Sequence, residues 1–300
     1  MPDLSFLQSI SFSRIRVIFE ARDSVILPVY KGSAFRGCLG GALRNESCTH
    51  LGQPCETCVA RFDCAFSRLY NSYVPIDHPH QRKYSKSPHP YIVDPLPDEK
   101  TVYQPGETFG FEFMLIGTAK NLLPIVVRSF DRMGNMGIGK DRGRFIPIKL
   151  ETIENPNDYD QISFSGTCKR LTLSFESPLR LKQDRELQTS PPSFDLFIRR
   201  LAQRLTLLAH FHCGAPWKET DGWVEDDLNV AIADSQLRWV DWRRYSGTQD
   251  TKMNFDGHIG TITYEGDLKP WIPLLIYGSW LHAGLTTTFG LGKYKLLFNG

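Results

Sequence analysis

Alternating hydrophobic and polar positions mark the first strand of each half of this chain. The segments "SFSRIRVIFEA" (11–21) and "CKRLTLSFESPLRL" (168–181) have the period of two that is typical of a half-buried strand. The order of residue types from Arg14 to Glu20 recurs from Arg170 to Glu176, 156 residues later. The match is a first sign that the chain contains two copies of one unit.

A second repeated pattern closes each half. Segments 121–150 and 268–297 each predict a helix with proline in its first turn, then a glycine-rich loop, then a strand. At a constant offset of 149 residues the pairs are Pro124 with Pro273, Gly143 with Gly292, Arg144 with Lys293, and Phe145 with Tyr294. Two independent matches therefore predict a duplication.

Helices and strands between these landmarks complete each unit. The first half adds a helix over 32–45 and a strand over 107–117, and the second adds an amphipathic helix from Phe194 to His212 and strands at 236–245 and 258–266. The order β-α-β-β-α-β predicts an α+β fold of tandem ferredoxin-like (RRM-like, βαββαβ) domains. We place them at 1–155, with a cysteine-rich and basic insertion at about 46–105, and at 160–300.

Composition narrows the class of protein. In 300 residues no window approaches the ~18 consecutive apolar residues of a membrane span, and the first residues lack the pattern of a signal peptide. We therefore expect a cytosolic (cytoplasmic) protein with no membrane partner. The formal charge of +2 is too small to indicate nucleic-acid binding by itself. Phosphate affinity depends on local clusters of basic residues, so these have to be considered one by one.

Four cysteines lie within seventeen residues, at Cys48, Cys55, Cys58 and Cys64. Four thiolates can satisfy tetrahedral zinc, and a structural zinc ion would order a loop that has little apolar material. The spacing differs from a C-x-x-C…C-x-x-C ribbon, so free reduced cysteines are an equal alternative. A metal analysis separates the two.

Two loops have the composition of phosphate or base binders. Segment 134–140 matches G-x-x-x-x-G-K, but Asp141 replaces the required Ser or Thr and the order of helix and strand is reversed, which excludes a nucleotide P-loop. The last loop, around Gly290 and Gly292, either turns backbone amides toward a phosphate or is a tight turn that needs glycine. Segment 66–100 mixes tyrosines with basic residues, as in a base-stacking surface or a solvated loop.

The duplicated halves, "KGSAFRGCLGGALR", "RYSGTQDTKM" and the ending "LHAGLTTTFGLGKY" together resemble the CRISPR-associated repeat-processing endoribonucleases of the RAMP superfamily. The resemblance implies binding of CRISPR repeat RNA and metal-independent cleavage, without a cofactor for catalysis. The 2′-OH would attack the adjacent phosphate and leave a 2′,3′-cyclic phosphate. It also implies that the protein can stay bound to the crRNA or join other CRISPR effector subunits.

The resemblance suggests site residues. Many relatives have a histidine near the first helix, whereas no histidine precedes His50 here. The catalytic candidates are therefore His282, Tyr30, Lys31, Arg36 and Tyr245. The RNA-binding candidates are Arg142, Arg144, Arg199, Arg243, Arg244, Gly290, Gly292 and Lys293. The missing histidine keeps a second hypothesis open, a non-catalytic RAMP subunit that binds crRNA in an effector complex.

Overall fold

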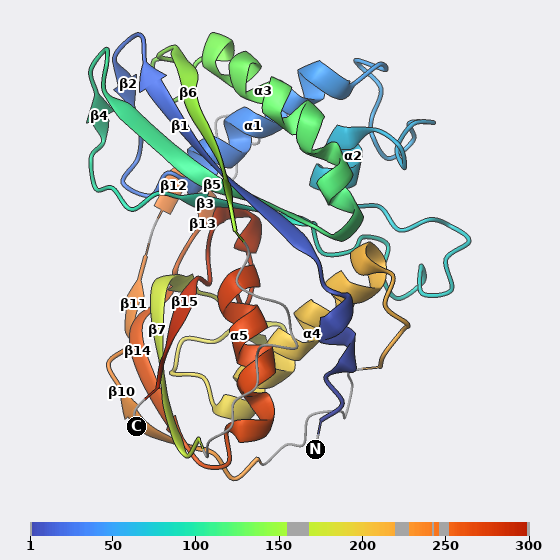
Figure 1. Ribbon diagram of the computed structural model, residues 1–300, viewed down its shortest axis with the longest axis vertical. Helices are drawn as coiled ribbons and strands as arrows, with labels where there is room; N and C mark the ends of the chain where they lie inside the picture. The colour runs from blue at the N-terminus through green and yellow to red at the C-terminus, as the bar shows by residue number, and fades with distance from the viewer. Residues whose placement is uncertain (1, 155–167, 220–227, 242, 246–251, 299–300) are drawn as a thin grey trace. The chain divides into compact units, whose positions relative to one another are not determined.

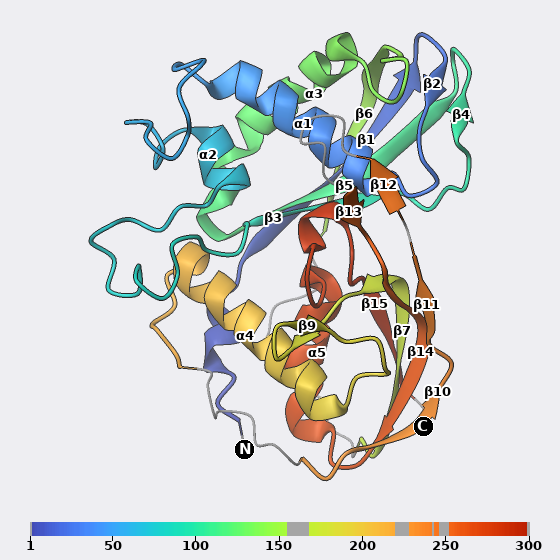
Figure 2. The ribbon, with the colours of Figure 1, turned by 180° about the vertical axis from the view of Figure 1, so that it is seen from behind.

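The computed structural model describes residues 2–154, 168–219, 228–241, 243–245 and 252–298. The chain divides into two compact units, shown from opposite sides in Figures 1 and 2. The N-terminal unit comprises 10–155 together with 211–214, and the C-terminal unit comprises 1–9, 156–210 and 215–300. The boundary predicted between 155 and 160 lies outside the described residues.

A four-stranded antiparallel sheet forms the centre of the N-terminal unit. Its order is β3-β5-β1-β6, where the strands are β1 (Phe12–Ala21), β3 (Tyr91–Pro95), β5 (Thr108–Ile116) and β6 (Phe145–Ile153). Helices α1 (Gly32–Ser47) and α3 (Leu123–Met136) lie on one face of this sheet (Figure 1). Because alternate β1 residues turn inward, Phe19 meets Phe130 of α3, and Phe111 of β5 meets Phe35 of α1, all of them buried.

Shorter elements surround this core. They are α2 (Ala65–Tyr70), the 3₁₀ turn η2 (Gly117–Leu122), and a two-stranded ribbon of β2 (Val25–Ile26) and β4 (Val102–Tyr103). Strand β3 belongs to the central sheet although it falls inside the segment predicted as an insertion. Its first three residues are all buried, so the alternation by which β1 is recognised is absent.

The C-terminal unit repeats the same topology. Its sheet order is β10-β14-β7-β15, with β7 (Arg170–Leu179), β10 (Ala231–Ser235), β14 (Gly257–Glu265) and β15 (Tyr294–Phe298) all antiparallel, and β11 (Arg238–Val240) also pairs with β14. The helices are α4 (Phe194–Cys213) and α5 (Ile272–Leu281). The predicted α+β architecture of tandem ferredoxin-like units is confirmed.

The remaining elements of this unit are short. They are the 3₁₀ turns η1 (Ser5–Ser9), η4 (Lys269–Trp271) and η5 (Thr287–Phe289), and the hairpins β8 (Lys182–Gln183) with β9 (Glu186–Leu187) and β12 (Arg243–Tyr245) with β13 (Lys252–Asn254). The strand predicted at 236–245 is thus divided between β11 and β12.

Equivalent aromatic contacts support the duplication. Phe145 begins β6 and its ring lies 5.0 Å from that of Phe19, while Tyr294 begins β15 and its ring lies 5.5 Å from that of Phe175. No helix among the described residues combines the length and the hydropathy that crossing a membrane requires.

Candidate functional site

The glycine loop, defined as residues 282–293 between α5 and β15, is shaped by left-handed backbone. Gly284, Gly290 and Gly292 have φ of 78°, 84° and 74°. A Cβ on Gly292 would lie 1.8 Å from the carbonyl oxygen of Ala283, which is far inside van der Waals contact. Packing within the unit therefore requires glycine at 292, with or without a ligand.

The backbone amides of this loop donate to the protein itself. Gly290 N–H donates to Thr287 O (2.9 Å), Gly292 N–H to Pro178 O (3.1 Å) and Lys293 N–H to the Ser177 hydroxyl (2.9 Å). Donors already used in this way cannot also bind a phosphate. Of the two alternatives for the loop, these hydrogen bonds favour the tight turn, and RNA contact by Gly290 and Gly292 stays a prediction.

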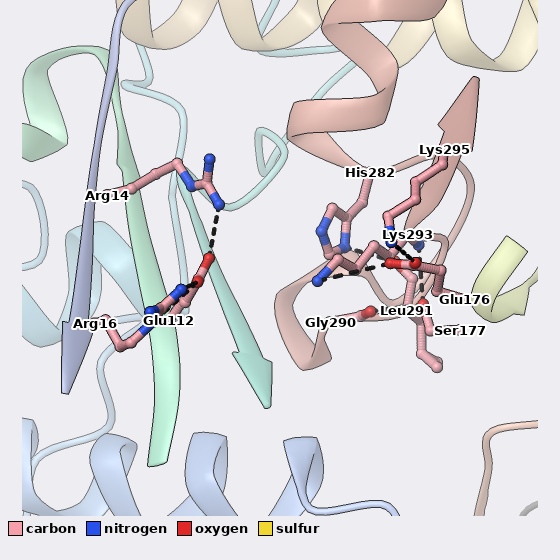
Figure 3. Close-up of polar contacts among 10 residues, drawn as sticks. All are labelled: Arg14, Arg16, Glu112, Glu176, Ser177, His282, Gly290, Leu291, Lys293 and Lys295. Atoms are coloured by element: carbon pink, nitrogen blue, oxygen red, sulfur yellow. Dashed lines mark hydrogen bonds and ion pairs between the residues drawn. The ribbon is translucent and has the colours of Figure 1, made fainter. Parts of the chain in front are cut away.

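Ser177 of β7 connects the two ends of the turn (Figure 3). Its hydroxyl donates to Gly290 O at 2.8 Å and accepts from Lys293 N at 2.9 Å, and the side chain is buried. Sequence reasoning missed this residue. A serine at an otherwise apolar strand end was the available signal, since buried hydroxyls need partners.

His282 lies at the C-terminal cap of α5 and is only 3% exposed. Its Nδ1 is 3.2 Å from Leu291 O across the loop. In this structure the ring contacts the loop, and the catalytic role of His282 stays a prediction. That role would require the imidazole to come within hydrogen-bond reach of the substrate.

Arg204 of α4 supports the same cap. Its Nε donates to His282 O and its Nη2 to Leu281 O, both at 3.1 Å. Burial lowers the pKa of Arg204 to about 10, so the guanidinium remains charged at neutral pH. The two hydrogen bonds satisfy carbonyl groups that the end of α5 would otherwise leave without donors.

Exposed charge at the loop comes from lysine side chains. Lys293 Nζ lies 3.9 Å from Glu176 of β7, and Lys295 forms an ion pair with the same carboxylate (Figure 3). Lys293 is partly buried and Lys295 exposed. Ion pairs of this kind near the surface are weakly held, so both ammonium groups can exchange this carboxylate for another anion.

The first-helix candidates Tyr30, Lys31 and Arg36 all belong to the N-terminal unit. Lys31 is 2% exposed, and its Nζ donates to Asp98 O at 2.6 Å. Burial lowers the pKa of Lys31, with the charge of Asp98 acting in the opposite direction. Tyr30 is half-buried, and burial followed by the charge of Asp94 raises the pKa of its phenol.

Lys31 also lines a cavity of about 210 Å³ together with Asp98 and Tyr103. The Tyr103 hydroxyl donates to Asp98 at 2.5 Å. Arg36 lies elsewhere on α1, with its guanidinium 4.9 Å from the ring centre of Tyr70. The structure thus places Lys31 at a cavity and Arg36 against an aromatic ring.

A charged cluster on β1 and β5 was missed by the sequence reasoning. Arg14 Nη2 and Arg16 Nη2 bind the two oxygens of Glu112 at 2.7 and 2.6 Å (Figure 3). Burial alone would raise the pKa of Glu112, but the hydrogen bonds from Arg16 and Arg14 outweigh it and lower the pKa. The repeated Arg-x-Arg on β1 was the signal, because alternate residues share one face.

The other predicted RNA contacts are dispersed. Arg142 is exposed, Arg144 forms a bidentate pair with Asp23 at 2.8 and 3.2 Å, and Arg199 lies 3.9 Å from Asp195. Arg243, Arg244 and Tyr245 form β12, of which the structure describes only the backbone.

The structure does not support the predicted zinc site. In the part of the chain that is described, no three His, Cys, Asp or Glu side chains gather closely enough to hold a metal ion. Cys48, Cys55, Cys58 and Cys64 are all free thiols. Main-chain turns shape this loop instead, and Cys64 lies 3.9 Å from the Ser47 hydroxyl. Proximity along the chain does not bring four thiolates to a common centre.

The chain consists of two ferredoxin-like units, and the second carries a glycine loop between its last helix and its last strand. Residues 8–174 match the family model AF_1859_N, described as an N-terminal domain, and residues 173–294 match that of the CRISPR-associated endoribonuclease Cas6. The two matches are consecutive and together cover both units. The chain thus contains the domain that the AF_1859_N model describes, and its residues 173–294 match the Cas6 endoribonuclease family.

Similar proteins share this architecture at low identity. An uncharacterized protein of Archaeoglobus fulgidus is 22% identical over 290 residues, covering 90% of this chain and 92% of its own. A Cas6 product complex has a TM-score of 0.60 at 14% identity, covering 96% of this chain and 100% of that one. Thermus thermophilus Cas6 has a TM-score of 0.55 at 12% identity, with 96% and 99% covered. These structures establish the shared fold.

Proposed function

We propose that this protein is an endoribonuclease that cuts precursor CRISPR RNA within its repeats, without a metal ion in the chemistry. The observation that carries the proposal is the Cas6 match over 173–294, which runs from β7 through the glycine loop into β15. Similar structures described as Cas6 product and substrate mimic complexes support RNA as the ligand. The substrate would be single-stranded or hairpin repeat RNA.

The proposed reaction is an internal transesterification. A base removes the proton of a ribose 2′-OH, the oxygen attacks the adjacent phosphorus, and the bond from phosphorus to the 5′ oxygen breaks. An acid protonates the leaving oxygen. The products are a 2′,3′-cyclic phosphate and a 5′-OH end, with no net consumption of water. Cations stabilise the charge that develops on the phosphorane.

Lys31 is our first candidate for a residue that contacts the reacting RNA from the N-terminal unit. Lys31 lines a cavity of the N-terminal unit, and the lowered pKa of its ammonium favours proton transfer. Tyr30 keeps its phenolic proton because its pKa is raised, so it acts as a hydrogen-bond donor. Arg36 and Tyr245 remain candidates for orienting the phosphate.

In this proposal His282 and Lys293 have different roles in the C-terminal unit. The buried imidazole positions the loop through Leu291, and Lys293 contacts RNA phosphate with its side chain. Arg142, Arg144, Arg199, Arg243 and Arg244 stay as proposed phosphate contacts. Partnership with other CRISPR proteins is supported by the likeness to a partial Cas6-RT-Cas1–Cas2 complex (TM-score 0.59, 13% identity), in which this chain covers 46% of the matched chain.

The direct test is cleavage of repeat RNA in excess EDTA. We expect cleavage with a 2′,3′-cyclic phosphate end, and no cleavage of an RNA that carries a single 2′-deoxyribose at the cut site. Lys31→Met should lower the rate at saturating RNA by about 10²–10⁴-fold if Lys31 transfers a proton. Lys100→Met is the matched control, because Lys100 is an exposed neighbour paired with Glu107.

The alternative is a non-catalytic subunit that binds crRNA. It is favoured by two observations: α1 contains no histidine, and His282 is buried. Tight binding of repeat RNA with no cleavage under any condition would establish the alternative and refute the nuclease. Loss of cleavage in EDTA alone would instead show that a metal ion takes part.

A further inference from the structure

A second cavity of about 210 Å³ lies within the N-terminal unit, in a region that the proposed chemistry does not use. Its walls come from the cysteine-rich loop, α2, the proline-rich segment after it, η2, and the last turn of α4. None of the residues that line it is acidic. The polar side chains along its walls that could contact a ligand include Arg61, Arg68, Tyr73, Ser87, Thr118 and His212.

Two arginines give the cavity its charge. Both are half-buried, and within the described chain neither has a carboxylate at ion-pairing distance. Arg61 donates to the main-chain oxygen of Glu56 at 2.9 Å and lies 4.7 Å from the ring centre of Phe62. Partly desolvated guanidinium groups without a carboxylate favour an anionic ligand, above all phosphate, whose oxygens match their fork of donors.

The opposite wall holds neutral hydrogen-bonding groups in place. His212 Nε2 lies 2.7 Å from Pro88 O and 3.2 Å from the Ser87 hydroxyl. A nitrogen this close to a carbonyl oxygen is its donor, so this contact fixes the tautomer. Ser87 and His212 therefore form a preorganised wall.

Tyr73 supplies an aromatic surface at the same cavity. Burial, followed by the charge of Glu56, raises the pKa of its phenol, so the ring stays neutral and the hydroxyl can donate. Lys86 Nζ lies 5.0 Å from the ring centre. An aromatic ring beside cationic groups suits a base stacked on the ring with its phosphate on the cations.

We propose that this cavity binds a ribonucleotide, with the phosphate on Arg61 and Arg68 and the ribose or base against Tyr73. At about 210 Å³ it is smaller than the ~300–1,000 Å³ typical of drug-sized ligands, which limits it to a single nucleotide. If the nucleotide belongs to repeat RNA, which rests on the proposed function, the cavity is a second anchoring site outside the catalytic machinery.

Calorimetry with the full chain tests the pocket itself. The probes are the four ribonucleoside 5′-monophosphates, the four matching nucleosides and inorganic phosphate. We expect a monophosphate to bind and its nucleoside to bind at least about tenfold more weakly, since a hydrogen bond to a charged group contributes about 1.5–3 kcal/mol. Arg61→Gln and Arg68→Gln should each weaken monophosphate binding by about tenfold or more.

Two control variants make the calorimetry decisive. Arg82→Gln removes an exposed positive charge from the same segment but does not line the cavity, so its affinity should equal that of the wild type. Arg68→Lys keeps the charge and should restore part of the affinity. Absence of monophosphate binding, or equal binding by wild type and both arginine-to-glutamine variants, overturns the proposal.

Repeat RNA distinguishes a chain nucleotide from a free one. If the pocket holds RNA, Arg68→Gln should reduce the slope of log affinity against log salt by about 0.7, with the cleavage rate at saturating RNA unchanged. Loss of monophosphate binding with an unchanged RNA slope identifies a free nucleotide as the ligand. Persistent cleavage without any nucleotide binding refutes the pocket alone, whereas nucleotide binding without cleavage refutes the proposed function alone.

Discussion

Glycine should be a better replacement than alanine for His282, which reverses the order found inside a helix. His282 has φ 60° and ψ 152°, a region that is essentially restricted to glycine. The corresponding cap of α3 is Gly137, with φ 71° and ψ 160°. Holding any side chain in this region costs about 1–3 kcal/mol.

The expected difference in stability between the two variants follows from what they share and where they differ. Both His282→Gly and His282→Ala lose the imidazole and its hydrogen bond to Leu291 O at 3.2 Å. They differ in backbone strain, which disfavours alanine by about 1–3 kcal/mol, and in the unfolded chain, where glycine loses about 0.4–1 kcal/mol through its greater freedom. We expect His282→Gly to be the more stable by about 0.5–2 kcal/mol.

Urea unfolding of both variants measures this difference. The midpoints should differ while the slopes against denaturant stay equal, which shows that stability alone has changed. Ala34→Gly in α1 is the reference for an ordinary helical position and should cost about 0.5–1 kcal/mol. If His282→Ala is as stable as His282→Gly, the cap is not strained and our account of it is wrong.

Three further variants test the loop and the charged cluster. Gly292→Ala, whose Cβ would lie 1.8 Å from Ala283 O, should lower both the melting temperature and the affinity for repeat RNA; a wild-type melting curve would refute the tight turn. Arg204→Met removes the donors to two carbonyl groups of α5 and should cost about 2–5 kcal/mol in urea unfolding, with a change under 1 kcal/mol contradicting the capping role. Glu112→Gln should cost about 1–2 kcal/mol near neutral pH. Because folding lowers the pKa of Glu112, this difference is present above the unfolded value of about 4.3 and should vanish as pH falls through the folded pKa; a difference independent of pH would contradict it.

The repeated elements could be predicted because the same short sequence patterns occur in both halves of the chain. Alternation in β1 and β7, and proline at the start of α3 and α5, depend on neighbours along the chain. β3 and β10 lack such a pattern, since the first three residues of β3 are buried and all five of β10 are exposed. Their place is set by pairing with β5 and β14, which a local pattern does not encode.

The candidate site was harder to predict because its contacts are distant in sequence. Glycine spacing in the last loop is compatible with both a phosphate cradle and a packed turn. What decides is Ser177, 116 residues before Lys293, together with Pro178. Likewise, the cysteine spacing permits a zinc knot, and only the backbone path shows that the thiols do not converge.

The caps of α3 and α5 differ, and the difference shows how the side chain of His282 stabilises the glycine loop. At Gly137 a Cβ would lie 2.1 Å from Arg142 O, so that cap tolerates only glycine. The same backbone in the second unit carries His282, whose ring reaches Leu291 O while Arg204 binds its carbonyl oxygen. These side-chain contacts cross the loop and offset the strain of the cap. A loop held in this way fixes the backbone of Lys293, so the proposed binding of an RNA phosphate there would require little further loss of backbone entropy.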